Sequence, residues 1–218
     1  MNEIYAIVEG QTEKNFVQKL LAPYLAPKNV FLRAEILRKP GEKGGDVKFA
    51  RARLHIESYL KQRSDTRVTL MVDYYGIRGD WPGYDASKKQ LTHIQKHEVL
   101  IKNTEDEIQR LFSDYNPRER FIPYFSMHEI EALYFCDTGK LAQSLNVARA
   151  AIDDILRDCG EPEKINDSSI TAPSKRLEAL SPKFRKIGTG ITIAESIGIS
   201  AMRAACPLFN AWITRLEA

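Results

Sequence analysis

The sequence predicts an α/β fold, with a Rossmann-like, mostly parallel sheet flanked by helices and followed by a helical carboxyl-terminal extension. In the first half of the chain, short apolar runs alternate with stretches of helical periodicity, a pattern typical of layered α/β proteins. The run at residues 67–72 is almost unbroken in its apolar character, as expected for a strand buried inside a parallel sheet. From residue 138 the pattern is helical nearly to the end.

The chain opens with a predicted strand, tight turn and helix. Residues 4–8 form an apolar run, Gly10 breaks the extended chain, and apolar residues recur at helical spacing within 16–25. Residues 30–37 are rich in β-forming side chains and predict a second strand. The basic, glycine-containing residues 39–45 predict a surface loop, which is a candidate border of a substrate groove and lacks the ending of a nucleotide-binding P-loop.

The middle of the chain continues this alternation. Asp46 is a candidate cap for a helix that extends to about Gln62, and the central strand at 67–72 follows. The glycine- and aromatic-rich residues 74–85 come directly after that strand, where site loops are common. A capping-box pattern at Thr104 predicts the start of a helix in the next helical stretch.

The last predicted strand lies at residues 120–125, and we expect it at an edge of the sheet because Pro123 cannot donate a backbone hydrogen bond. The polar interruption at 160–173 separates two helical stretches. It is the candidate boundary between an α/β domain, residues 1–160, and a helical extension packed on it, residues 161–218.

The composition indicates a soluble globular protein of 218 residues, 43% of them apolar and 28% charged. No apolar run approaches the ~20 residues that cross a bilayer, and no secretory signal is evident. The three cysteines are far apart in the sequence, which favours reduced thiols and a cytoplasmic location. The net charge of +3 is too small to indicate a nucleic-acid partner by itself.

Two acidic residues, Glu9 and Asp73, end apolar strands and precede glycine-containing turns. If these strands are parallel neighbours, both carboxylates project over the same sheet edge, where ligands of α/β proteins bind. Such a pair repels unless it is protonated or bridged by a cation. Oxygen ligands suit Mg²⁺ or Mn²⁺ and the transfer of phosphoryl groups. A solvated loop carboxylate at Glu9 is the alternative.

The segment from Thr171 onward is mildly basic and opens a helix near Pro173. Helix amino termini and basic side chains attract phosphate. Four residues are candidates for binding phosphate or nucleic acid: Ser174, Lys175, Arg176 and Lys186. An ordinary surface helix with Ser174 as its cap explains the same pattern. Four aromatic residues of the site loop are candidates for stacking on bases or for packing the loop: Tyr74, Tyr75, Trp81 and Tyr84.

Several segments resemble known proteins. VEGQTE at residues 8–13 resembles the first motif of Toprim domains, the metal-binding fold of topoisomerases, primases and the overcoming-lysogenization-defect nucleases. LMVDYYG at 70–76 resembles their second motif. The chain is also similar to a prokaryotic family of unknown function with these motifs, through HEIEAL at 128–133, APSKR at 172–176 and CPLF at 206–209. Together the matches span most of the chain.

The resemblance implies a Toprim-like fold in which Glu9 acts as acid/base or metal ligand and Asp73 as metal ligand. Toprim domains usually carry a second aspartate two residues after the first, and Tyr75 stands at that position. Three acidic residues are candidates to replace the missing ligand: Asp80, Glu129 and Glu131. Because Glu129 and Glu131 are two residues apart, we expect only one of them to point at the site, and we favour Glu129.

The function expected from these motifs is that of a Mg²⁺- or Mn²⁺-dependent nuclease, or a related phosphoryl-transfer enzyme acting on nucleic acid. The resemblance adds a role in defence against phages or plasmids and an ATPase partner encoded nearby. Homo-oligomers are a further expectation. One alternative is a non-catalytic partner protein that binds nucleic acid or an ATPase through a degenerate Toprim site, which Tyr75 favours. Another is a hydrolase of a phosphorylated small molecule.

Overall fold

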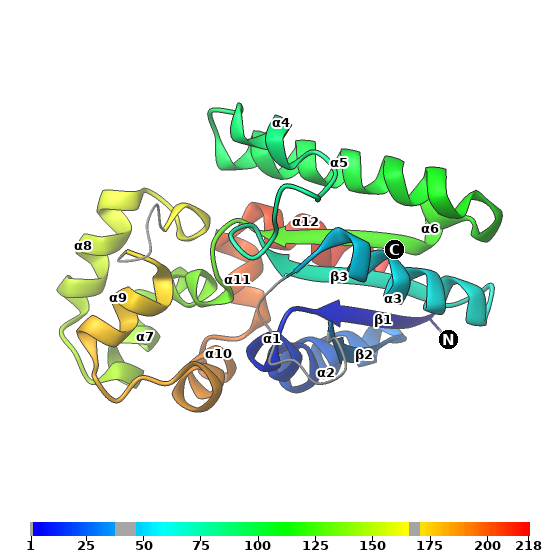
Figure 1. Ribbon diagram of the computed structural model, residues 1–218. Coiled ribbons are helices and arrows are strands. Elements are labelled where there is room, and N and C mark those ends of the chain that lie inside the picture. Colours follow the sequence, from blue (N-terminus) through cyan, green and yellow to red (C-terminus); the bar gives the residue numbers. More distant parts are fainter. Residues whose placement is uncertain (1, 38–46, 166–170) are drawn as a thin grey trace.

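The computed structural model describes residues 2–37, 47–165 and 171–218 (Figure 1). In this part of the chain, four parallel strands form one sheet in the order β2-β1-β3-β4. They are β1 (Asn2–Val8), β2 (Val30–Ile36), β3 (Arg67–Asp73) and β4 (Phe121–Ser126). The predicted α/β class, all four predicted strands and the position of the Pro123 strand at an edge are confirmed.

Most of the described chain is helical. The helices near the sheet are α1 (Gln11–Phe16), α2 (Ala22–Leu25), α3 (Phe49–Gln62), α4 (Tyr84–Lys88), α5 (His93–Phe112), α6 (Pro117–Arg120) and α12 (Pro207–Glu217). The others are α7 (Thr138–Leu145), α8 (Arg149–Cys159), α9 (Pro173–Leu180), α10 (Ile191–Ile197) and α11 (Ile199–Ala205). Shorter helical segments are η1 (Val17–Leu21), η2 (Ala26–Lys28), η3 (Ser113–Tyr115), η4 (Ile130–Cys136), η5 (Pro162–Lys164) and η6 (Lys186–Gly190).

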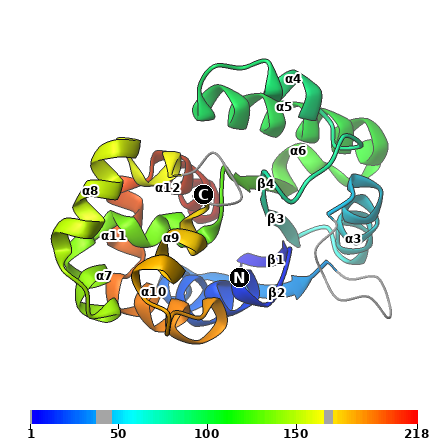
Figure 2. The same cartoon turned by 60° about the vertical axis from the view of Figure 1, so that its left-hand side comes forward.

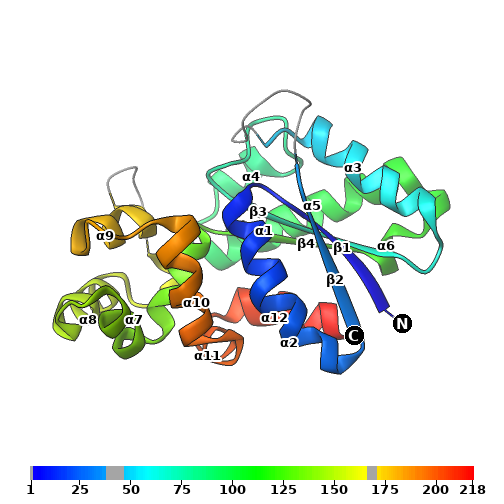
Figure 3. The same ribbon diagram turned by 90° about the horizontal axis from the view of Figure 1, so that it is seen from below.

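Helices cover both faces of the sheet. On one face, Tyr5 of β1 stacks on Tyr59 of α3 with ring centroids 4.1 Å apart. On the other face, Tyr124 of β4 stacks on Trp212 of α12 at 4.6 Å, and the Trp212 indole donates a hydrogen bond of 2.8 Å to the Thr69 hydroxyl. Helices α1 and α2 lie on the α12 side of the sheet (Figure 3). Burial on both faces explains the almost continuous apolar character of β3.

A group of helices, α7 to α10, lies beyond the carboxyl ends of the strands (Figures 1 and 2). Helix α7 packs against both α8 and α10, so this group combines helices from both sides of residue 160. The carboxyl-terminal part also reaches the sheet, because α12 packs on β4. The helical extension therefore contacts the sheet directly and also borders the edge where Glu9 and Asp73 lie.

Two local predictions have different outcomes. The helix predicted to end at Gln62 does so, as α3, whereas its proposed cap Asp46 and the predicted loop at 39–45 lie outside the described residues. The helix start predicted at Thr104 is wrong. The cap of helix α5 lies twelve residues earlier, where Thr92 and Gln95 form a capping box, and Thr104 is buried and accepts a hydrogen bond from the Trp81 indole at 2.9 Å.

None of the helices in the described ranges combines the length and the apolar character that a membrane crossing requires.

Candidate functional site

The carboxyl ends of β1, β3 and β4 meet at one edge of the sheet. Val8 of β1 is paired with Met71 of β3, and Asp73 at the end of β3 is paired with Ser126 at the end of β4. Glu9 follows β1 directly, and its Oε2 accepts a hydrogen bond of 3.3 Å from the Asp73 backbone N–H. The strands of Glu9 and Asp73 are therefore parallel neighbours, which is the condition under which the sequence analysis expected the two carboxylates at one edge.

The Glu9 carboxylate is packed against the turn that follows β3. A Cβ atom at Gly76 would lie 2.5 Å from Glu9 Oε2, a distance that real Cβ contacts do not reach. Glycine at this position therefore lets the turn pass directly over the carboxylate. Burial, reinforced by the negative charge of Glu13, raises the pKa of Glu9 to about 6.

Glu13 is a member of the site that the sequence analysis did not single out. It lies in the first turn of α1 and is only 8% exposed, and burial raises its pKa. A Cβ atom at Gly10 would lie 3.2 Å from its Oε2. The available signal was a glutamate within the first motif, four residues after Glu9, but its inward direction depends on how α1 packs.

Asp73 lies at the centre of this group of acids. Burial, followed by the charges of four glutamates, raises its pKa well above the ordinary value. These glutamates, in order of decreasing effect, are Glu13, Glu9, Glu131 and Glu129. The four glutamates and Asp73 are called the carboxylate cluster below. The structure thus brings together four of the five residues proposed as metal ligands, and adds Glu13.

Glu129 and Glu131 both face the ammonium group of Lys186. Lys186 Nζ lies 2.7 Å from Glu129 Oε1 and 3.7 Å from Glu131 Oε2. The prediction that only one of these glutamates points at the site is therefore wrong. The periodicity argument assumed that both belong to a helix, but Glu129 has an extended backbone and precedes η4, while Glu131 lies inside η4.

The two glutamates differ in their surroundings. Burial would raise the pKa of Glu129, but hydrogen bonds from Lys186 and from Ser174 hold it below its ordinary value. Glu131 is 1% exposed, burial raises its pKa to about 7, and its Oε1 has no hydrogen-bond partner in the described part of the chain. For Lys186, the nearby carboxylates outweigh burial and raise the pKa, so its side chain stays protonated.

The predicted phosphate-binding residues fall into two groups. Ser174 and Lys186 already hold the Glu129 carboxylate: the Ser174 N–H donates to it at 2.9 Å, and the Ser174 hydroxyl donates at 3.1 Å. Ser174 is thus the second residue of α9 and not its cap, which is Ala172. Lys175 is exposed and pairs with Glu178 at 2.7 Å.

Arg176 points away from the carboxylate cluster. Its Nε donates to the Thr171 carbonyl oxygen at 3.0 Å, and its side chain lines a separate cavity. Asp80 also lies apart, since it is exposed and its carboxylate accepts from the backbone N–H of Ala50 at 3.5 Å. Of the loop aromatics, Trp81 and Tyr74 are buried, whereas Tyr75 is 48% exposed.

The arrangement concentrates negative charge around one fixed cation. Across the described ranges, no group of three or more His, Cys, Asp or Glu side chains is arranged to hold a metal ion. Lys186 is instead the cation that contacts this cluster, through Glu129 and Glu131. Four of the five carboxyl groups have raised pKa values, among them Glu9 at about 6 and Glu131 at about 7. They can therefore exchange protons or attract a cation near neutral pH.

Comparison with known proteins assigns the chain to a family. A family model described as "Domain of unknown function (DUF4276)" matches residues 8–217. The chain belongs to this family. No curated protein and no solved structure matches it. The DUF4276 match begins at the end of β1 and includes all of α12, so it covers the whole carboxylate cluster as well as Lys186 and both sides of residue 160.

Proposed function

We propose that this DUF4276 protein is a Mg²⁺- or Mn²⁺-dependent nuclease, or a related phosphoryl-transfer enzyme, that acts on nucleic acid at the carboxylate cluster. The observation that carries the proposal is the meeting of Glu9 and Asp73 at the end of adjacent parallel strands, joined by a hydrogen bond of 3.3 Å. The resemblance of these two residues to the Toprim motifs points to the same chemistry.

The chemistry of the donors suits a hard divalent cation, although no three of them are arranged around one point in the described part of the chain. All of the side-chain donors are carboxylate oxygens, which Mg²⁺ and Mn²⁺ prefer, and burial followed by mutual repulsion raises the pKa of Asp73. Asp73 would hold the ion, Glu9 would either ligate it or handle a proton, and Glu131, whose Oε1 lacks a partner among the described residues, is the best candidate for a further ligand. A bound ion would supply charge stabilisation for the transferred phosphoryl group.

The chain's own residues would prepare the reaction around this ion. Glu9, with its pKa near 6, is suited to accept a proton from an attacking water at neutral pH. Lys186 remains positively charged and is placed to attract a substrate phosphate. To do so, its ion pair with Glu129 would have to loosen. An ATPase partner and a role in defence against phages or plasmids remain predictions from the resemblance.

A second function is favoured by one specific observation, the contact of Lys186 with Glu129 and Glu131. A fixed ammonium neutralises carboxylates without any metal, and Tyr75 stands where Toprim domains carry a second aspartate. In this second proposal, the protein is a non-catalytic partner that binds nucleic acid or an ATPase, and the carboxylate cluster serves the fold alone.

Cleavage assays separate the two proposals. Single- and double-stranded DNA and RNA are incubated with the purified protein in Mg²⁺ or Mn²⁺, and the Glu9→Gln and Asp73→Asn variants are assayed in parallel. The matched control is Asp80→Asn, which makes the same change at an exposed carboxylate of the same loop. The nuclease proposal expects metal-dependent cleavage by the wild type and by the control, and loss of cleavage in both cluster variants.

Cleavage that survives both cluster substitutions contradicts the nuclease proposal, because it would come from another site or from a contaminant. If no substrate is cleaved while the wild type and both variants bind nucleic acid or an ATPase equally well, the second proposal is supported.

A further inference from the structure

A cavity of about 540 Å³ lies beside the carboxylate cluster. It is lined by Tyr74 and Tyr75, which directly follow Asp73, and by His128, which directly precedes Glu129. The cavity therefore shares its wall with two of the loops that carry the cluster. Its volume is in the range of pockets that hold a small organic ligand.

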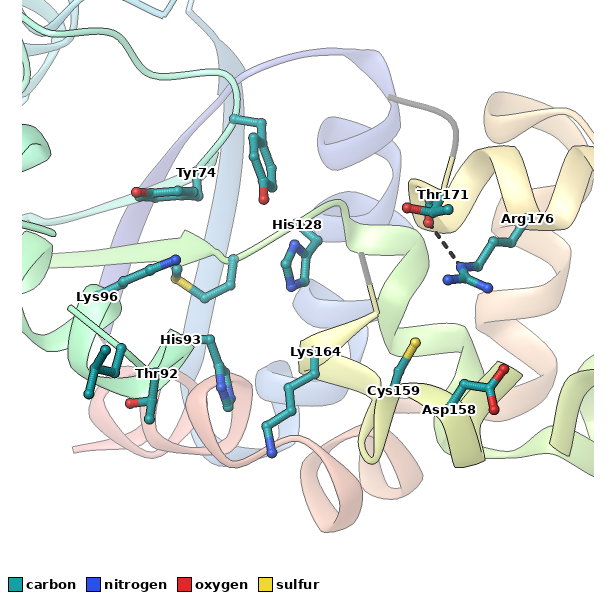
Figure 4. A pocket seen from close by; sticks show the side chains of 13 residues that line it. Tyr74, Thr92, His93, Lys96, His128, Asp158, Cys159, Lys164, Thr171 and Arg176 are labelled. Carbon is teal, nitrogen blue, oxygen red and sulfur yellow. Dashed lines mark hydrogen bonds between the residues drawn. The ribbon is translucent and has the colours of Figure 1, made fainter. Parts of the chain in front are cut away.

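Cationic side chains from three different elements line the cavity. The charged side chains in its lining are three cations and one carboxylate: Lys96 of α5, Lys164 of η5, Arg176 of α9 and Asp158 of α8. Figure 4 shows Lys96 and Arg176 on opposite sides of the cavity, with His128 between them. Within the described residues, neither Lys96 nor Arg176 has an ion-pair partner among the carboxylates, whereas Lys164 pairs with Glu161 at 3.3 Å.

The same cavity presents aromatic rings. Tyr75 and the buried His128 stack with ring centroids 5.8 Å apart and planes inclined by 22°, and Tyr74 packs edge-on against Tyr75 at 5.4 Å. Tyr75 is nevertheless 48% exposed, so its ring remains accessible to a ligand. Exposed aromatic rings beside fixed cations are the combination that binds the base and the phosphate of an unpaired nucleotide.

We propose that this cavity binds one nucleotide, with its base against Tyr75 and its phosphate held by Arg176, while Lys96 adds positive charge from the opposite side of the cavity. The nucleotide would be a single-stranded residue of the substrate next to the carboxylate cluster, or a free nucleoside monophosphate, since both carry the same groups. As a substrate subsite the proposal rests on the proposed function, but nucleotide binding by itself does not require cleavage.

Binding is therefore measured without divalent metal, by isothermal titration calorimetry in EDTA. The probes are thymidine 5′-monophosphate, adenosine 5′-monophosphate, a 5′-phosphorylated single-stranded trinucleotide and inorganic phosphate. The variants are Arg176→Gln, Lys96→Gln and Tyr75→Leu. The control is Lys175→Gln, because Lys175 adjoins Arg176 in α9 but is exposed and pairs with Glu178. Circular dichroism melting verifies that each variant is folded.

We expect the wild type to bind at least one nucleotide probe more tightly than inorganic phosphate. Arg176→Gln should weaken this binding by about tenfold or more. Lys96→Gln should weaken it by a smaller factor that still exceeds the change in the Lys175 control, and each variant should lower the salt dependence of trinucleotide binding by about 0.7 in log–log slope. Loss of stacking in Tyr75→Leu should weaken nucleotide binding by roughly tenfold. Lys175→Gln should change the affinity for the nucleotide by less than about twofold.

A trinucleotide that binds more tightly than both mononucleotides identifies the strand as the source, and equal affinities identify the free nucleotide. The proposal is overturned if no nucleotide probe binds, if inorganic phosphate binds as well as the nucleotides, or if the cavity variants bind as the Lys175 control does. If nucleotides bind in the cavity but no substrate is cleaved, the nuclease proposal fails alone. If Asp73-dependent cleavage occurs but the cavity variants keep full affinity and an unchanged KM, the cavity proposal fails alone.

Discussion

Lys186 and Glu129 are 57 residues apart in sequence, yet the Lys186 ammonium lies 2.7 Å from Glu129 Oε1. This contact ties η6 of the carboxyl-terminal part to the loop that follows β4. It also places a permanent positive charge beside Glu131, which is otherwise surrounded by protein. The stability of the cluster and its affinity for cations therefore depend on one lysine.

Replacing this lysine should destabilise the protein at neutral pH. Lys186→Met leaves Glu131 buried without its nearest cation, and we expect a loss of about 1–3 kcal/mol in the free energy of unfolding. The value is below that for a fully buried pair because the Lys186 side chain is 38% exposed. Urea unfolding at pH 7.5 measures the loss, and at pH 5.5 the loss should shrink as Glu131 becomes protonated.

The matched control for this prediction is Lys175→Met, which removes only an exposed ion pair to Glu178 and should cost less than about 1 kcal/mol. Equal losses for the two lysine variants would contradict the role given to Lys186.

Gly76→Ala should displace the Glu9 carboxylate while the fold remains. The new methyl group would lie 2.5 Å from Glu9 Oε2, so the side chain or the turn must shift. If the protein is a nuclease, a shift of this size at Glu9 should lower the cleavage rate by roughly 10²-fold. Initial rates of cleavage and the melting temperature are measured together.

Gly79→Ala is the control in the same loop, because a Cβ there meets nothing within 4 Å. It should leave both the rate and the melting temperature unchanged. A Gly76→Ala protein as active as Gly79→Ala would show that the position of Glu9 does not matter for cleavage.

Glu163 should make the protein less stable as pH rises. It is 5% exposed, burial raises its pKa from 4.5 to about 7, and its two oxygens accept the backbone N–H groups of Leu208 and Phe209 at the start of α12. Because the folded state binds more protons than the unfolded state between these pH values, this residue's contribution to stability falls by roughly 3 kcal/mol between pH 4.5 and pH 8.

Glu163→Gln should remove this pH dependence. Compared with the wild type, the variant should gain about 3 kcal/mol in relative stability between pH 4.5 and pH 8. At the acidic end it should be the less stable protein, because the amide retains only one acceptor oxygen for two N–H groups. Urea unfolding at several pH values, with the exposed Glu178→Gln as control, tests this. A stability difference that stays constant with pH would disprove the assignment.

Trp212→Phe should destabilise the sheet by about 1–3 kcal/mol. The change removes the indole N–H that donates to the Thr69 hydroxyl at 2.8 Å, along with part of the stacking area on Tyr124. A double-mutant cycle with Thr69→Val in urea unfolding isolates the hydrogen bond. Additive losses in the double variant would show that the two side chains are not coupled.

The strands and the Glu9–Asp73 edge could be predicted from sequence because both depend on local patterns. Apolar runs define the strands, and the place where each run ends fixes the edge at which its carboxylate lies. In the same way, Pro123 placed β4 at an edge through the backbone donor that it lacks. These features need little knowledge of the rest of the chain.

The remaining features depend on contacts between distant segments. Thr104 carries the local signature of a helix start, but burial against Trp81 places it in mid-helix. The rule that residues two apart lie on different faces of a helix does not apply to Glu129, because its backbone is extended. Nothing near Lys186 in the sequence indicates that its ammonium would lie among the carboxylates.

The hydrogen bond between Thr69 and Trp212 has a consequence for the order in which the protein can mature. A ribosome makes β3 long before it makes α12, so the part of the sheet that α12 covers stays exposed until residues 207–217 have been made. Trp212 lies in the last helix of the family domain. The face that carries Thr69 and Tyr124 can therefore be fully buried only after α12 has been made, and a chain that stops before α12 would expose it.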